Sequence, residues 1–137
     1  MNASLLAWDD SLLVNFEIID NQHKELITII NNLIRGCNGV KAIQDVLFIK
    51  TLRKAIEYAQ THFSTEENYL RQVNYPDFPD HKQEHESFVS EVVKQLKAFE
   101  ENRNDPVVLV DFLKSWLFNH IAVVDKKYAP YLAGLQA

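Results

Sequence analysis

Apolar residues recur every three or four positions through most of this chain, which is the spacing of one face of an α-helix. Four amphipathic segments can be separated, covering residues 21–34, 43–73, 80–100 and 106–131. Pro76 and Pro79 interrupt the pattern between the second and third segments, where a helix cannot continue. Asp105 followed by Pro106 is typical of a helix N-cap and first helical position. The pattern predicts four helices.

The links between these segments are short, about four to eight residues, which favours antiparallel neighbours. The predicted fold is all-α, an up-down-up-down four-helix bundle over residues 21–131, with an N-terminal arm (1–20) and a C-terminal tail (132–137). Only three glycines and four prolines occur in 137 residues, and 47% of the residues are hydrophobic. This composition suits one helical domain with a substantial core.

The net charge of −5 includes no block of Lys or Arg, so we expect no nucleic-acid partner. No apolar run approaches the roughly 20 residues that span a bilayer, and the first 20 residues show no signal-peptide pattern. Cys37 is the only cysteine, so an internal disulfide is impossible and a reducing compartment fits. We therefore expect a cytoplasmic monomer without a membrane partner.

Several polar residues interrupt the apolar stripes and lie on the inner helix faces. They are His23, His62, Glu66, His81, His85 and His120. Burying an unpaired carboxylate costs several kcal/mol or more, and a metal ion satisfies imidazoles and carboxylates together. Glu66 is four residues after His62 and shares its face, whereas Glu67 is rotated by about 100° toward a neighbour or water.

Any one of these signals has an ordinary explanation. A single inward histidine is more often a hydrogen-bonded core residue than a metal ligand, and a pair such as His62 and Glu66 is often a helix-surface pair. Here all five histidines lie on core stripes, and every predicted helix carries at least one. This distribution favours a metal centre.

Four motifs share their order and spacing with one known family. They are residues 20–24 (DNQHK), 62–67 (HFSTEE), 81–85 (HKQEH) and 116–120 (WLFNH), with Asp125 five positions later. In these segments the chain resembles the hemerythrin family, from Trp8 to about Tyr131. The family fold agrees with the bundle predicted above, and myohemerythrin is itself a reference example of that topology.

The resemblance implies a pair of non-haem iron ions joined by an oxo or hydroxo bridge. His81, His85 and His120 would bind one iron, His23 and His62 the other, and Glu66 and Asp125 would bridge them. With octahedral irons, the first is saturated and the second keeps one open position. The residues implied to line an apolar oxygen pocket over that position are Leu26, Phe63, Trp116, Leu117 and Ile121.

These expectations describe a protein that binds dioxygen reversibly, for transport, storage or delivery to an oxygen-consuming enzyme, and is not itself an enzyme. The alternatives are an oxygen or redox sensor, an iron-storage or repair protein, and a di-iron oxidase. Ferritin-like oxidases use Glu-x-x-His motifs and more carboxylates than histidines, unlike the proposed ligands here.

Three features depart from the expected pattern. Asn15 stands where many bacterial relatives have glycine, and Leu70 where methionine is common. His120 and Asp125 are five residues apart, which is about 140° out of phase on a regular helix. Either the Asp125 carboxylate reaches around the helix, or the helix is locally wound as a π-bulge.

Overall fold

A computed structural model describes residues 5–37 and 39–136; residues 1–4 of the predicted arm and residue 137 of the predicted tail lie outside this range. The long helices are α1 (Glu17–Gly36), α2 (Lys41–Gln72), α3 (Phe78–Glu100) and α4 (Pro106–Ser115). The chain continues from α4 through a π-helical segment η2 (Trp116–Val124), a 3₁₀ turn η3 (Asp125–Tyr128), α5 (Ala129–Leu132) and η4 (Ala133–Gln136).

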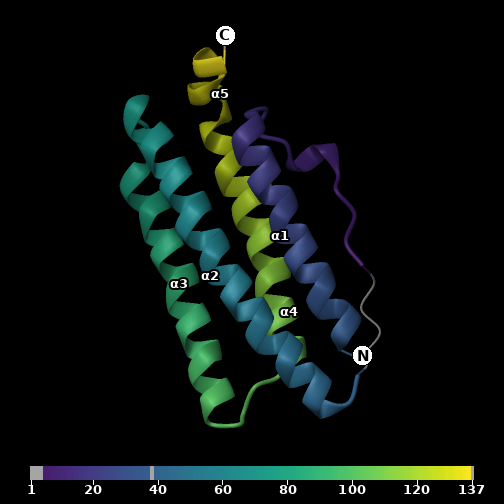
Figure 1. Cartoon of the computed structure of the whole chain (residues 1–137). Coiled ribbons are helices and arrows are strands. Elements are labelled where there is room, and N and C mark those ends of the chain that lie inside the picture. Colours follow the sequence, from purple (N-terminus) through teal and green to yellow (C-terminus); the bar gives the residue numbers. More distant parts are fainter. Residues whose placement is uncertain (1–4, 38, 137) are drawn as a thin grey trace.

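Successive long helices run in opposite directions and pack side by side, so the predicted up-down-up-down bundle is confirmed (Figure 1). The fourth helix is one continuous helical stretch whose winding changes at Trp116. It begins as predicted, because the Asp105 side chain accepts a hydrogen bond from the Val107 N–H at 2.9 Å and Pro106 follows the cap.

The first helix begins at Glu17, four residues before the predicted start. The buried Asp20 carboxylate accepts hydrogen bonds from the backbone N–H groups of Val14 (2.9 Å) and Phe16 (3.2 Å). Asn15 between them has a φ of 61°, a left-handed conformation that glycine, or asparagine among other residues, adopts readily. Asparagine therefore takes the role of the glycine expected here.

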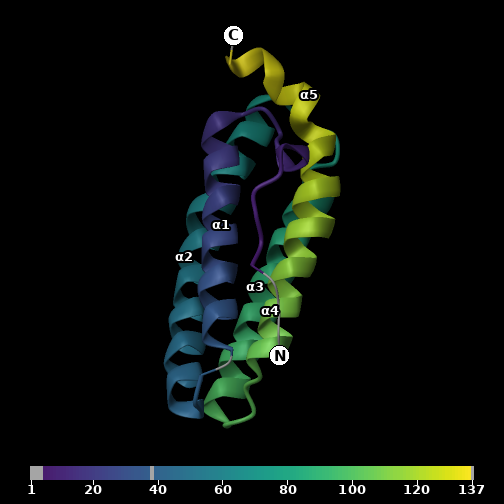
Figure 2. The same cartoon turned by 90° about the vertical axis from the view of Figure 1, so that its right-hand side faces the viewer.

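The arm before α1 is docked on the bundle rather than loose (Figure 2). Asn31 on α1 accepts a hydrogen bond from the Leu6 N–H at 2.7 Å and donates one to the Leu6 carbonyl at 2.8 Å. Leu12 is buried in the main core, and Phe16 is buried in a smaller cluster near the C-terminal end of the chain. The arm therefore packs apolar side chains against the bundle.

The stretch Pro106–Leu135 is long and apolar enough, by length and composition alone, to cross a membrane. The sequence pattern had predicted no such run. Its inner face carries Leu109, Leu113 and Ile121, which are completely buried in the bundle core. The core helix of a soluble bundle has the same composition, so the absence of a membrane partner stays a prediction.

Candidate metal centre

All seven predicted ligands meet in the interior of the bundle, and each is at most 3% exposed. They come from four elements and the turn after them: His23 from α1, His62 and Glu66 from α2, His81 and His85 from α3, His120 from η2, and Asp125 from η3. Their nitrogen and oxygen atoms form two groups, each compact enough to hold a metal ion. One contains Glu66, His81, His85 and His120, and the other contains His23, His62, Glu66 and Asp125.

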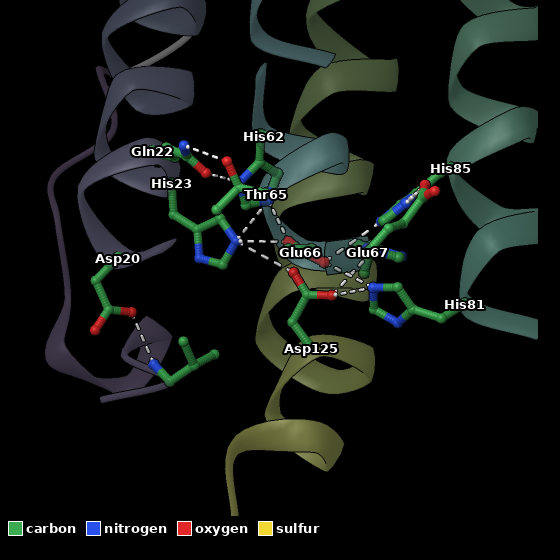
Figure 3. Close-up of polar contacts among 12 residues, drawn as sticks. Asp20, Gln22, His23, His62, Thr65, Glu66, Glu67, His81, His85 and Asp125 are labelled. Atoms are coloured by element: carbon green, nitrogen blue, oxygen red, sulfur yellow. Dashed lines mark hydrogen bonds and ion pairs between the residues drawn. The ribbon is translucent and has the colours of Figure 1, made fainter. Parts of the chain in front are cut away.

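Glu66 belongs to both groups and lies between them (Figure 3). Its Oε2 is 2.7 Å from His81 Nε2 and 3.4 Å from His85 Nε2. Its Oε1 contacts His62 Nε2 and lies 3.5 Å from His23 Nε2. One oxygen therefore faces each group, which is the arrangement of a bridging carboxylate.

Asp125 spans the same gap from the opposite side. Its Oδ1 lies 3.0 Å from His120 Nε2 and 3.3 Å from His81 Nε2, and its Oδ2 lies 3.2 Å from His23 Nε2. The π-helical winding of η2 brings this carboxylate to the face of His120, because the Asp125 N–H donates to the His120 carbonyl five residues back. Of the two possibilities left by the sequence, the structure shows the π form.

The charges in this cluster are strongly coupled. Burial raises the pKa of Glu66, but the neighbouring histidines outweigh burial and hold it well below its usual range. Burial lowers the pKa of His23, but its close contacts with the Asp125 and Glu66 carboxylates raise it to about 9. The pKa of His120 is likewise about 9, because Asp125 outweighs burial, whereas burial prevails at His62 and lowers its pKa. Without a metal ion, protons on His23 and His120 balance the two carboxylates.

Protons do not satisfy the whole cluster. Five inward-facing atoms have no hydrogen-bond partner among the described residues: Glu66 Oε1, His85 Nε2, His120 Nε2 and both carboxylate oxygens of Asp125. Unsatisfied buried polar atoms are rare and costly, and each of these can offer a lone pair to a cation, His120 Nε2 after it has lost its proton. A pair of cations satisfies them together, so the residues present fit a two-metal centre.

Three residues contact Nδ1 of a histidine, the ring nitrogen that points away from the cluster. These outer partners were not predicted from the sequence. Gln22 Oε1 lies 2.7 Å from His62 Nδ1, Glu67 Oε2 lies 3.0 Å from His85 Nδ1, and Glu84 Oε1 lies 3.1 Å from His120 Nδ1. Each partner is adjacent in sequence to a proposed ligand but contacts a histidine of another helix. That adjacency was the available signal, because one residue rotates a helix by about 100° toward its neighbour.

Aromatic rings pack directly on the histidines. Phe63 stacks on His85 with centroids 3.9 Å apart, and Trp116 stacks on His120 at 3.8 Å. Both were predicted to line a pocket over the two-histidine position, yet both lie against rings of the three-histidine group. The other predicted pocket residues are buried in the same core cluster: Leu26, Leu117 and Ile121.

Two tyrosines near the cluster were also missed. The Tyr58 ring stacks on His62 at 5.0 Å, and the Tyr128 ring packs against His81 at 5.5 Å. Both hydroxyls are buried without a hydrogen-bond partner among the described residues, and burial raises both pKa values well above the usual value for tyrosine. They remain neutral at physiological pH and offer no base to the site.

Comparison with known proteins identifies the family. Residues 14–132 match the family model described as Hemerythrin HHE cation binding domain. The chain belongs to the hemerythrin family. The match includes residues 14–20, which the sequence pattern had assigned to the arm, and so agrees with the early start of α1.

Similar hemerythrins occur in bacteria and animals. A bacteriohemerythrin of Stenotrophomonas maltophilia is 30% identical over 92% of this chain and 80% of its own length. The myohemerythrin of Sipunculus nudus is 32% identical over 88% of each chain. A crystal structure of wild-type hemerythrin superposes with a TM-score of 0.80 at 28% identity, covering 95% of this chain and 99% of that one.

Proposed function

We propose that this protein holds two non-haem iron ions and binds dioxygen reversibly at one of them. The observation that carries the proposal is the uneven division of five histidines around two shared carboxylates. His81, His85 and His120 face one position, His23 and His62 face the other, and Glu66 and Asp125 contact histidines of both groups. One position is therefore a ligand short of the other, which favours a single site for a small exogenous ligand.

Iron suits these donors, because imidazole and carboxylate are both ordinary iron ligands. When bound, two ferrous ions supply the two electrons that dioxygen takes up, and return them when it leaves. The protein's own residues hold the metals and keep water away. Phe63, Trp116 and Leu117 are buried apolar neighbours of the site and exclude solvent from it.

The surroundings favour a carrier over an oxidase. Among the described residues, the buried acids outside the ligand set reduce to Asp20, whose carboxylate is engaged by the backbone of the arm. The buried tyrosines stay neutral, as shown above. A turnover cycle that reduces dioxygen further needs a proton donor or base beside the reacting atoms. The nearby hydroxyls of Tyr58 and Tyr128 are poor proton donors, because burial raises their pKa values well above the usual value.

Dioxygen uptake by the reduced protein tests this proposal. The diferrous protein should take up about one dioxygen per iron pair and release it unchanged when the oxygen pressure is lowered, over repeated cycles. Optical spectra and an oxygen electrode follow both steps. Steady oxygen consumption with an electron donor, well above slow autoxidation, would instead identify an oxidase.

A further inference from the structure

The outer partners of the histidines are distributed unevenly between the two metal positions. In the three-histidine group, His85 and His120 each present Nδ1 to a carboxylate, Glu67 at 3.0 Å and Glu84 at 3.1 Å. In the two-histidine group, His62 presents Nδ1 to the neutral amide oxygen of Gln22 at 2.7 Å. The remaining two, His23 and His81, have no Nδ1 partner among the described residues.

These contacts fix which nitrogen faces the centre. The ring nitrogen that touches the outer partner is Nδ1, and it donates its hydrogen to the carboxylate or amide oxygen. When these rings are neutral, Nε2 of His62, His85 and His120 carries the lone pair and lies beside the Glu66 or Asp125 carboxylate, where a cation would bind. An N–H···carboxylate contact also makes the imidazole a stronger electron donor than an N–H···amide contact does, because the partner carries a full negative charge.

We propose that Glu67 and Glu84 are positioning residues that strengthen metal binding at the three-histidine position, so that this position fills first and the two-histidine position fills second. The third histidine works in the same direction, and the carboxylates add to it. The inference rests on the proposed pair of metal positions but not on dioxygen binding. It gives Glu67, which the sequence placed toward a neighbour or water, a defined role.

The two carboxylates should contribute unequally. The Glu67 side chain is 17% exposed and the Glu84 side chain is 44% exposed. Water screens the more exposed charge, so Glu84 should polarise its histidine less than Glu67 does. Replacing each carboxylate by glutamine keeps an oxygen that accepts the Nδ1–H bond and removes only the charge.

Zinc titration of the metal-free protein tests the proposal without any oxygen chemistry. Competition with a chromophoric chelator gives the affinity of each step, and NMR of the histidine rings shows which group is occupied. The wild-type chain should bind two zinc ions, and the first should shift the signals of His81, His85 and His120. Glu67→Gln should weaken the first step about tenfold or more, the range typical of outer-partner changes, and Glu84→Gln should weaken it less.

Two further variants serve as controls, one expected to leave the metal affinity unchanged and one expected to raise it. Glu86→Gln replaces an exposed carboxylate on α3, the helix of Glu84, and should leave both binding steps unchanged. Gln22→Glu should tighten the second step about tenfold, because it gives His62 the charged partner that it lacks. A merely structural role predicts no such gain.

Three results would overturn the inference. They are occupation of His23 and His62 first, glutamine variants that behave like Glu86→Gln, and a Gln22→Glu variant with no tighter second step. Binding of a single zinc ion per chain would refute the two-metal site itself and this inference with it, whereas two steps unmoved by the variants would overturn only the roles of Glu67 and Glu84.

Discussion

Replacing Glu66 and Glu67 one at a time tests which of these adjacent carboxylates bridges the two metal positions. Glu66 places one carboxylate oxygen toward each metal group, whereas Glu67 contacts His85 Nδ1, on the far side of that ring, and the Arg71 guanidinium. Glu66→Ala therefore removes a charged ligand from both positions, and Glu67→Ala removes none. We expect Glu66→Ala to lose both metals together, and Glu67→Ala to keep a site for two.

The expected losses of metal affinity differ enough between the two variants to be measured. Removing one partner of a buried charge pair costs about 3–5 kcal/mol, which is roughly a hundred- to a few thousand-fold in affinity. Glu66 is completely buried, so this full range applies to it. Removing an outer partner costs about 10- to 100-fold. At a ferrous concentration that saturates the wild type, Glu67→Ala should still fill while Glu66→Ala stays nearly empty.

The assay is anaerobic reconstitution with ferrous iron, followed by gel filtration and elemental analysis, with zinc measured in parallel because zinc competes for such ligands. Circular dichroism of each metal-free variant checks that the helices are intact, and Glu66→Gln provides a variant of nearly unchanged volume. Equal iron content in Glu66→Ala and Glu67→Ala would refute the assignment of the bridge. Loss of one iron only from Glu66→Ala would show that Glu66 serves a single position.

The remaining predictions concern the apolar wall, the π segment and pH. Leu117→Ala opens space beside His120 and should speed the decay of the oxygenated protein to the ferric form, followed optically; unchanged decay would assign Leu117 to packing alone. Deleting Ala122 within η2 leaves His120 and Asp125 four residues apart, so α-helical winding would keep both on one face and iron content should stay at about two per chain; loss of iron would show that the π-helical winding itself is needed. In the metal-free protein, the pKa values of about 9 at His23 and His120 stabilise the folded state most below pH 6.5, so the Tm should fall as the pH rises from 6.5 through 9. A flat Tm over that interval would count against these shifts.

The sequence predicted most of the fold, because the spacing of apolar residues and prolines along the chain marks where helices lie. Helices α2 and α3 begin within about two residues of their predicted starts, since apolar periodicity and prolines mark those positions directly. The start of α1 was wrong because it depends on the contact of Asp20 with the backbone of Val14 and Phe16, which periodicity does not encode. Gly36 lies in the last turn of α1, where a side chain would collide with Leu47 of α2.

The residues of the candidate site likewise fall into those that the sequence predicts and those that depend on packing between helices. The inward histidines and Glu66 follow from helix faces, which the sequence determines within each helix. The outer partners depend on how one helix is rotated against the next, because Gln22, Glu67 and Glu84 each reach a histidine on another element. Such rotations are set by packing over the whole bundle. The stacking of Phe63 on His85 depends on the same packing.

The π-helical segment shows where local preference and site geometry oppose each other. Nothing in the apolar stripe of residues 106–131 predicts a change of winding at Trp116, and π-helical turns are rarer and weaker than α-helical ones. The signal was instead a mismatch between two chemical requirements, since His120 and Asp125 are five residues apart but must face the same centre. The structure resolves it with a hydrogen bond from the Asp125 N–H to the His120 carbonyl, which brings residues five apart into register. The chain keeps a less favourable winding where the ligands require it, so the π segment is itself an argument that these two side chains act on one site.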